Sequence, residues 1–572
     1  MRIITNCLRA ALIASLFTAL PATVQAQSWQ WATAATTTSN SSNVTITATA
    51  LDGAGNTVVA GYFSGTVVLG TITLTSTGGI DGFVGRLSST GVWTQAVRAG
   101  GSGAAVYINA LALDNAGNAV VAGNFTGSTI SFGTTTLTNA GGGSTTDIFV
   151  ARLSSAGAWT QAVRAGTARS ESAASLALDA AGHAVVGGTF YGPTASFGTT
   201  VLTNASPVSA GVDTGDLFIA HLSPAGTWTQ VSGAGGTDDD ALNALAVDAN
   251  GTVSAVGYFK SPTISFGTTT LANIFPQGTV STAFVARLSS AGAWTQATAN
   301  TTGSPIPTEV AIDGSGNTVV AGFFFGTTTD FGPFTLTNTN PNGASGDIFV
   351  ARLNSSGTWT QAIRAGGTDD DRNAGLSLDA SGNAYVTGSF RGPSAAFGAI
   401  TLTNANPASN ANSKTDIFVA RLSTNNIWTS AVRAGGLESE SPTDIAVNSA
   451  SNRVVLTGQF SNPLVIGPFT FPAPPNTTAY VAQLSDLTLG SKHATAQELV
   501  SLTPNPAHGS AQLALPAAAS IHPVLVFDAL GREVRRQTVP ARSTTLTLNV
   551  AGLTPGLYVV RYGTATGRLV VE

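Results

Sequence analysis

Hydrophobic and polar residues alternate along most of the chain, in short runs that end at glycine-containing turns. In one stretch, Ala110–Asn118 leads into a turn, Ala119–Phe125 returns, and Asp147–Leu153 and Ala158–Ala165 follow. Residues 128–139 alternate in the same way and predict a small additional hairpin. A period of two, with β-branched and aromatic residues between glycine turns, is typical of antiparallel strands. We therefore predict a four-stranded sheet with one accessory hairpin.

This unit is repeated along the chain. Seven tryptophans recur at intervals of 64 to 69 residues, and the last six stand in near-copies of the phrase Gly-Ala-Trp-Thr-Gln-Ala-Val-Arg. They are Trp29, Trp93, Trp159, Trp228, Trp294, Trp359 and Trp428. A fixed period of this length means that one supersecondary unit is copied, and a single sheet cannot cover both of its apolar faces. The copies must therefore stack on one another.

The two ends of the array indicate how it stacks. The seventh unit stops at Leu484, after its third strand, whereas Ser28–Ala34 resembles an isolated fourth strand. Together they make one complete blade if the array closes on itself, and closure removes exposed strand edges. We predict an all-β fold: a seven-bladed β-propeller over residues 27–485, with four-stranded antiparallel blades and an N-terminal closing strand.

One turn of the unit carries a recognisable motif. Leu51–Asn56, Leu113–Asn118 and Leu378–Asn383 each read Leu-Asp-x-x-Gly-Asn, and a valine-rich strand follows in most copies. This pattern resembles the seven-bladed β-propeller repeats of secreted bacterial proteins, over roughly residues 27–485. The resemblance implies an architecture but no activity, because such repeats carry unrelated functions.

The first 26 residues predict a secretory signal peptide. Arg2 and Arg9 supply positive charge, Ala10–Leu20 is an apolar run too short to span a bilayer, and cleavage is expected between Ala26 and Gln27. We expect no transmembrane segment. The only cysteine lies within this leader, so the mature chain has no disulfides.

A different pattern begins at Glu498, after an expected linker over residues 486–497. Its marks are Pro504 and Pro506, a turn at Asp528–Arg532 and the run Gly552–Tyr558, among strands that predict a small β-sandwich. Residues 498–572 resemble the C-terminal sorting domain of the type IX secretion system in Bacteroidota. The resemblance implies the secretion machinery as a partner and delivery to the cell surface or medium. An accessory sandwich is the alternative, and Glu572 stands where a basic residue is more usual.

Composition and charge exclude one class of partner. Charged residues are only 9% of the chain, and 43% of its residues are hydrophobic, as in a folded protein. Without Arg2 and Arg9, 22 basic residues remain against 29 acidic ones, a net charge of -7. Nucleic-acid binding requires basic patches that neutralise phosphates, and this chain has none. We therefore expect no nucleic-acid partner.

The densest acidic runs lie between units. They are Asp238, Asp239, Asp240, Asp369, Asp370 and Asp371, followed by Glu438 and Glu440. Carboxylates gathered near an axis could bind Ca²⁺ or act as an acid–base pair. However, the runs belong to separate blades, and adjacent aspartates point in different directions. Solvated loops that cap strands are the favoured interpretation, with calcium as the weaker one; we expect no other cofactor.

The repeated charged residues favour structural roles. The turn aspartates, such as Asp52 and Asp114, are expected to bond to the backbone of their own turns. The third-strand arginines, such as Arg86 and Arg152, are expected to cover blade edges or to pair with the third-strand aspartates, such as Asp147. The tryptophans suit blade packing better than sugar stacking.

No catalytic motif stands out. The five histidines replace repeat residues or lie outside the array, and the chain has no nucleophile elbow, phosphate loop or zinc spacing. We predict a monomeric surface or extracellular binding and adhesion scaffold rather than an enzyme, with a carbohydrate or a surface protein as ligand. The alternative is a secreted polysaccharide hydrolase or lyase, which requires inward-facing carboxylates about 5–10 Å apart.

Overall fold

The structure is a computed structural model in which two compact units form. It describes residues 29–205, 213–275, 280–406, 414–448, 453–485, 501–514, 522–528, 532–540, 543–562 and 565–572. The first unit, Gln27–Thr488, contains the predicted array, and the second contains the described residues from 501 onward. The predicted signal peptide, its cleavage site at Ala26 and Gln27, and the linker at 486–497 lie outside the described residues. No helix among those residues is long and apolar enough to cross a membrane.

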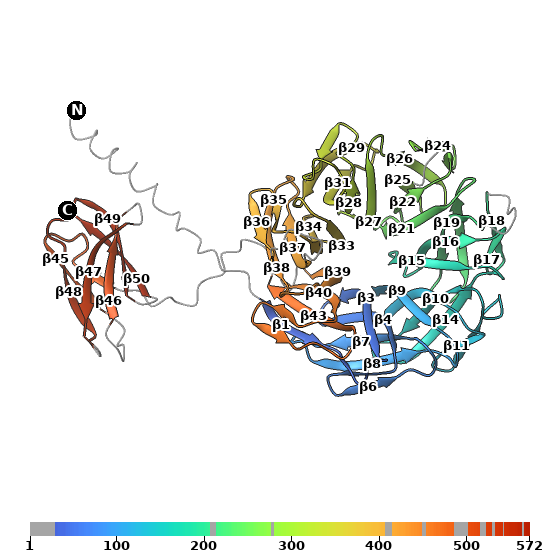
Figure 1. The fold of residues 1–572 in the computed structure, drawn as a ribbon, viewed down its shortest axis with the longest axis horizontal. Coiled ribbons are helices and arrows are strands. Elements are labelled where there is room, and N and C mark those ends of the chain that lie inside the picture. The colour runs from blue at the N-terminus through green and yellow to red at the C-terminus, as the bar shows by residue number, and fades with distance from the viewer. Residues whose placement is uncertain are drawn as a thin grey trace, which may run out of the picture. The chain divides into compact units, whose positions relative to one another are not determined.

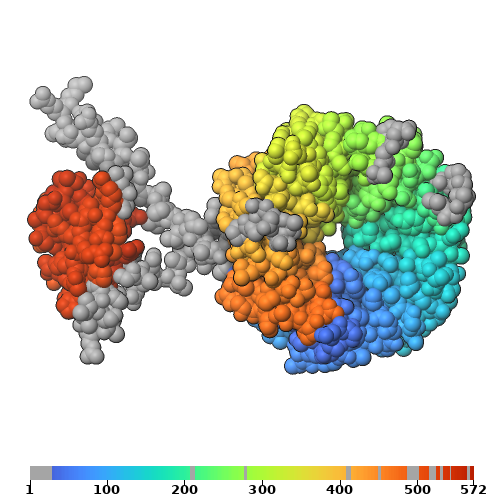
Figure 2. All heavy atoms as spheres, in the orientation of Figure 1, coloured from blue at the N-terminus to red at the C-terminus, as the bar shows by residue number. Residues whose placement is uncertain are grey.

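Seven four-stranded antiparallel sheets form a closed ring in the first unit, as the sequence predicts (Figure 1). Their innermost strands follow one another around the ring and return from the seventh blade to the first. The innermost strands are β3 (Asn43–Leu51), β9 (Val106–Leu113), β15 (Glu171–Leu178), β21 (Asp240–Val247), β27 (Ser304–Ile312), β33 (Asp371–Leu378) and β39 (Ser441–Asn448). Figure 2 shows an opening in the middle of the ring.

The other three strands of each blade succeed one another outward. The second strands are β4 (Thr57–Ser64), β10 (Ala119–Phe125), β16 (Ala184–Tyr191), β22 (Val253–Phe259), β28 (Thr318–Phe325), β34 (Ala384–Phe390) and β40 (Arg453–Phe460). The third strands are β7 (Asp81–Leu87), β13 (Asp147–Leu153), β19 (Gly215–Leu222), β25 (Thr282–Leu288), β31 (Asp347–Leu353), β37 (Asp416–Leu422) and β43 (Thr478–Ser485). The fourth strands are β8 (Trp93–Ala99), β14 (Trp159–Ala165), β20 (Trp228–Ala234), β26 (Trp294–Ala299), β32 (Trp359–Ala365), β38 (Trp428–Ala434) and β1 (Trp29–Ala34).

The accessory hairpin occurs in every blade, between the second and third strands. In blade one it is β5 (Thr66–Leu69) with β6 (Ile72–Thr75), to which β2 (Thr36–Thr37) adds a third strand. The others are β11 (Thr129–Phe132) with β12 (Thr135–Thr138), β17 (Thr194–Phe197) with β18 (Thr200–Thr203), β23 (Thr263–Phe266) with β24 (Thr269–Ala272), β29 (Thr328–Phe331) with β30 (Phe334–Thr337), β35 (Ser394–Phe397) with β36 (Ile400–Thr403), and β41 (Leu464–Ile466) with β42 (Phe469–Phe471).

The predicted closing strand is present. β1 pairs antiparallel with β43, with Trp29 opposite Leu484 and Ala34 opposite Tyr480. Across the same seam, the Arg453 guanidinium donates to the carbonyl oxygen of Gly55 in blade one at 2.8 Å. The two ends of the array are therefore joined within one sheet and also between neighbouring sheets.

The first strand of each blade is longer than its alternation predicts. In blade two we expected it from Ala110, but β9 begins at Val106. The register against β10 skips Asn109, and a similar irregularity occurs in all seven first strands that the structure describes. A bulge inserts one residue and reverses the side on which later residues point, so the period of two is interrupted. This interruption explains why the predicted start of the strand was wrong.

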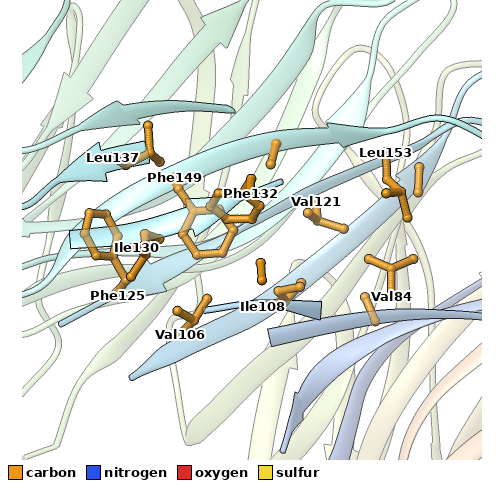
Figure 3. Packing of buried hydrophobic residues seen from close by; sticks show 14 of the residues in the cluster. Val84, Val106, Ile108, Val121, Phe125, Ile130, Phe132, Leu137, Phe149 and Leu153 are labelled. Carbon is orange, nitrogen blue, oxygen red and sulfur yellow. The ribbon is translucent and has the colours of Figure 1, made fainter. Parts of the chain in front are cut away.

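Blade packing uses the repeated aromatics (Figure 3). In blade two, Phe132 on the accessory hairpin lies 4.9 Å from the ring of Phe149 and 4.9 Å from that of Trp159. The Trp159 indole donates to the carbonyl oxygen of Arg98, which belongs to the preceding blade, at 3.1 Å. The tryptophan therefore contacts its own hairpin and the blade before it.

The charged repeat residues confirm one expectation and correct another. Asp114 Oδ1 accepts from the backbone N–H of Ala116 at 2.9 Å and of Asn118 at 2.8 Å, which is the predicted turn. Arg152, however, donates to the carbonyl oxygen of Gly182 in the next blade at 2.8 Å. Asp147 is paired instead with Arg164 of the fourth strand, at 2.7 Å. Sequence alone could not distinguish these partners, because both arginines recur with the same period.

The second unit is a sandwich of two sheets, as predicted. One sheet orders β44 (Ser501–Thr503), β45 (Ser510–Ala514) and β48 (Thr545–Asn549). The other orders β47 (Glu533–Val539), β46 (His522–Phe527), β49 (Gly556–Tyr562) and β50 (Ala565–Val571). Leu513 and Leu548 from the first sheet share a core with Val526 and Val560 from the second.

Candidate functional site

The two faces of the ring differ in their connections. Because the strands are antiparallel, the first-to-second and third-to-fourth turns lie on one face, which we call the turn face. The accessory hairpins and the links between blades lie on the other, which we call the loop face. The acidic runs singled out in the sequence belong to the loop face.

Each acidic run is divided between the surface and the interior. Asp238 is exposed, and Asp239 pairs with Lys260 at 3.2 Å. Asp240, by contrast, is the first residue of β21 and is fully buried. The Ser261 hydroxyl donates to its Oδ2 atom at 2.8 Å. The expectation of a solvated loop is therefore wrong for Asp240.

The second run repeats this arrangement two blades further on. Asp369 is half-buried, and Asp370 pairs with Arg372 at 3.1 Å. Asp371 begins β33 and is fully buried. Within the described ranges, no group of three or more His, Cys, Asp or Glu side chains is placed to hold a metal ion. Calcium binding at either run stays a prediction.

Three groups of aromatic side chains, two of them with charged neighbours, lie on the loop face; we call them the rim clusters. They occur at the junctions of blades one and two, three and four, and five and six. Their members are Tyr62 and Tyr107; Tyr191, Asp239, Tyr258 and Lys260; and Phe323, Phe325, Asp370 and Arg372. All stand at or next to the loop-face ends of first and second strands, the two innermost strands of each blade.

The cluster between blades three and four joins two phenols to an ion pair. Burial raises the pKa of Tyr191 above its usual value, and the negative charge of Asp239 adds to the effect. The hydrogen bond from Lys260 to Asp239 raises the pKa of the lysine, which keeps the ammonium charged. Both tyrosine rings are half-buried, so part of each faces solvent.

The cluster between blades five and six joins aromatic rings to a cation. Phe323 and Phe325 lie 5.7 Å apart, edge to face. The Arg372 guanidinium lies 5.1 Å from the first ring and 5.8 Å from the second, within cation–π range. At the junction of blades one and two, the rings of Tyr62 and Tyr107 lie 5.0 Å apart, also edge to face.

Two carboxylates on the innermost strands were missed from the sequence. Glu309 on β27 and Asp444 on β39 directly follow the bulge of their strands. The other five blades have a small residue at this place, namely Ala48, Ala110, Ser175, Ala244 and Gly375. Aligning the seven units at the bulge exposes the two acids, but the bulge itself breaks the pattern on which such an alignment depends.

The charge of one of these acids, Asp444, acts on the other beside the central opening. Asp444 Oδ2 accepts from the backbone N–H of Thr49 in blade one at 2.7 Å. Burial raises the pKa of Asp444 to about 7. Burial also raises the pKa of Glu309 well above its usual value, and the charge of Asp444 raises it further. Both side chains are only half-covered from solvent, since they stand on strands that line the ring's interior.

The turn face has a cleft of its own between blades four and five, with a volume of about 720 Å³. Asp248, Asp313 and Arg287 line it. The two aspartates hold their own turns, and Arg287 donates to the carbonyl oxygen of Gly316 at 2.6 Å. These side chains already serve the repeat, so the loop face and the central opening are the better candidates.

Comparison with known proteins identifies the second unit. Residues 501–572 match the family described as the secretion system C-terminal sorting domain. The chain therefore ends in a type IX sorting domain, and the protein is secreted and delivered to the cell surface. The predicted signal peptide at residues 1–26 stays a prediction. No curated protein matches the chain.

Solved structures resemble the ring only distantly. An ulvan lyase of polysaccharide lyase family PL25 is 11% identical, covers 76% of this chain and 93% of its own, and has a TM-score of 0.37. A protein from Lactobacillus plantarum is 13% identical over 63% of this chain and 98% of its own, with a TM-score of 0.26. The exo-inulinase from Aspergillus awamori is 10% identical over 68% and 88%, with a TM-score of 0.21. Likenesses of this size say nothing about the chemistry of this chain.

Proposed function

We propose that the ring is a binding module for an extracellular carbohydrate, displayed or released by the sorting domain, and that the ligand binds on the loop face. The observation that carries this proposal is the set of rim clusters. Aromatic rings stand there at the inner ends of three blade junctions, and at two of these junctions charged hydrogen-bonding groups stand beside them. No catalytic motif in the sequence competes with this role.

The chemistry of the rim clusters suits a sugar. The C–H face of a pyranose packs on an aromatic ring, while carboxylate, ammonium and guanidinium groups bond to its hydroxyls and acidic substituents. Asp239 with Lys260 and Asp370 with Arg372 supply donors and acceptors at two of the junctions. Their spacing around the opening favours an extended oligosaccharide over a single sugar.

We expect the double variant Tyr191→Ala/Tyr258→Ala to bind its glycan more weakly. Each lost stacking contact should reduce affinity about tenfold, which corresponds to about 1.4 kcal/mol. The mature full-length chain would be screened on a glycan array, and its best glycan titrated by calorimetry. Ile427→Ala is the matched control, because this residue is 60% exposed in a turn of the opposite face. An array without any bound glycan, or a double variant that binds unchanged, would contradict the proposal.

A second candidate function, a polysaccharide hydrolase or lyase, is favoured by Glu309 and Asp444. An acid whose pKa lies near neutral pH can both give and take a proton, and glycosidic cleavage requires two such carboxyl groups about 5–10 Å apart. This hypothesis requires that the substrate reach the central opening from one face of the ring.

Under this second reading, Glu309→Gln should lower polysaccharide cleavage by about 100-fold or more, because one proton carrier is lost. The assay would follow new reducing ends and unsaturated products over a panel of neutral and acidic polysaccharides. Asp330→Asn, on the accessory hairpin of the same blade, is the control and should keep wild-type activity. Cleavage that persists in Glu309→Gln would reject the role of this pair.

A further inference from the structure

Four of the seven blade junctions bury a pair of acids. One acid stands at or next to the start of the third strand of a blade, and the other at or next to the start of the first strand of the next blade. The pairs are Asp147 with Glu171, Asp216 with Asp240, Asp347 with Asp371, and Asp416 with Glu440. Each of the eight side chains is at most 3% exposed.

In three of the four pairs the two acids converge on one glycine, which follows the fourth strand of the first blade. A Cβ atom added to Gly166 would lie 2.6 Å from Glu171 Oε2 and 2.9 Å from Asp147 Oδ1. Added to Gly435, it would lie 2.6 Å from Asp416 Oδ1 and 2.8 Å from Glu440 Oε2. Such distances are shorter than a Cβ contact allows, so the glycine after the tryptophan phrase leaves room for the pair.

In two of the pairs, Asp147 with Glu171 and Asp416 with Glu440, the oxygens that converge are the ones without donors. In the other two pairs the second acid is already bonded, since Asp371 Oδ2 accepts from the N–H of Gly367 and Asp240 Oδ2 accepts from the Ser261 hydroxyl. Asp147 Oδ2 accepts from Ala140 N–H and Arg164, and Glu171 Oε1 accepts from the N–H and hydroxyl of Thr167. Asp147 Oδ1 and Glu171 Oε2 are buried without a hydrogen-bond partner among the described residues. Asp416 Oδ1 and Glu440 Oε2 are likewise buried without a hydrogen-bond partner among the described residues. A buried, unpaired carboxylate is costly, so the pair requires a proton or a cation between its members.

Charge balance favours a proton. At three of the junctions an arginine already pairs with the first acid: Arg164 at 2.7 Å, Arg364 at 3.3 Å and Arg433 at 2.8 Å. Two carboxylates and one guanidinium sum to -1, which a single proton neutralises. A Ca²⁺ ion would leave an excess of positive charge, and it takes 6–8 oxygen ligands where two are presented.

At the other three junctions the partner position does not hold a second acid. Where the third strand starts with Thr282 or Thr478, the partner place holds Pro305 or Val44. Where it starts with Asp81, which is balanced by Arg98 at 2.9 Å, the partner is Val106. A second acid therefore occurs only opposite another acid.

We propose that two of these acid pairs, Asp147 with Glu171 and Asp416 with Glu440, are each joined by one shared proton, which holds neighbouring blades together and whose loss at alkaline pH loosens the ring. Burial raises the pKa of Glu171 and of Glu440 to about 8, with the facing aspartate adding to the shift in each. The same two causes raise the pKa of Asp240 to about 7 and that of Asp371 well above its usual value.

The direction of the pH effect follows from these shifts. The folded pKa values lie above the unfolded ones, so folding favours the protonated pair. The stabilisation is complete below the unfolded pKa values and decreases as pH rises through the folded ones, from about pH 4.5 to about pH 8. The charged groups facing Glu171 are Asp147 on β13 and Arg164 on β14. Those facing Glu440 are Asp416 on β37, Arg433 on β38, the neighbouring Glu438, and Tyr480 on β43.

Replacing the two glutamates by glutamine tests this proposal, because the glutamine amide always carries the hydrogen-bond donor that the shared proton would supply. The melting temperature of the mature full-length chain would be followed from about pH 5 to about pH 9. We expect wild type to lose several degrees towards the alkaline end, and Glu171→Gln/Glu440→Gln to lose clearly less. Asp330→Asn is the control, since this residue stands on the accessory hairpin strand β29, away from both pairs, and it should follow wild type.

Two results would overturn the proposal. One is a double variant whose alkaline loss equals that of wild type. The other is a melting temperature that rises on adding Ca²⁺ and falls with a chelator, because a cation would then hold the pairs. If the double variant does not fold, infrared spectroscopy of wild type decides. Protonated carboxyl bands that persist at neutral pH and disappear near pH 9 support the shared proton, and their absence at neutral pH rejects it.

Discussion

Removing Gln27–Ala35 should lower the melting temperature of the ring by about 10 °C or more, because the seventh blade then loses its fourth strand. Among the strands that the structure describes, β1 alone covers the outer edge of β43. Trp29 packs into the core of blade seven, and Trp31 into that of blade one. The Trp31 indole also donates to the carbonyl oxygen of Ser89 at 3.2 Å. Each ring contributes about 2 kcal/mol of burial, so the loss is at least about 4 kcal/mol before the strand's backbone bonds are counted.

Thermal unfolding of the truncated chain would be measured beside the mature chain. A synthetic peptide of the sequence Gln27–Ala35 serves as a control, because it can refill the exposed edge of β43. Added in excess, it should restore part of the lost stability, and a peptide with both tryptophans replaced by alanine should restore less. An unchanged melting temperature in the truncated chain would show that the ring does not depend on this strand.

Removal of Glu498–Glu572 should leave the protein in the periplasm of its native host. This segment contains the type IX sorting domain, and its described strands have a hydrophobic core of their own. The expected effect is close to complete, since the sorting domain is the part that the secretion machinery recognises. Cell fractionation and protease accessibility on intact cells would locate the protein.

The reciprocal experiment controls for misfolding of the truncated chain. Fusing residues 498–572 to an unrelated periplasmic reporter should bring that reporter to the cell surface. Efficient surface delivery of the truncated chain, or a fused reporter that remains periplasmic, would refute the role of this segment.

Much of the architecture follows from the sequence because its signals are local. The period of two predicts strands wherever successive side chains meet opposite faces of a sheet. The turn at Asp114 can be predicted because the aspartate bonds to the backbone within four residues. Ring closure could also be predicted, since the isolated Trp29 strand and the missing fourth strand of the last unit are both visible in the chain. The sorting domain carries motifs of its own.

The candidate sites arise from contacts between blades, which no local pattern records. Asp147 and Glu171 belong to different sheets, and the charge of Asp444 raises the pKa of Glu309 from two blades away. After the bulge in each first strand, the side chains change to the opposite side of the sheet. A strict period of two therefore assigns the wrong residues to the side that lines the interior. In the sequence, Asp240 and Asp371 look like parts of solvated acidic loops, although both are buried in the folded ring. The amino-acid order determines strands, repeat and closure, whereas only the packing of one blade on the next decides which acids are buried, paired or exposed.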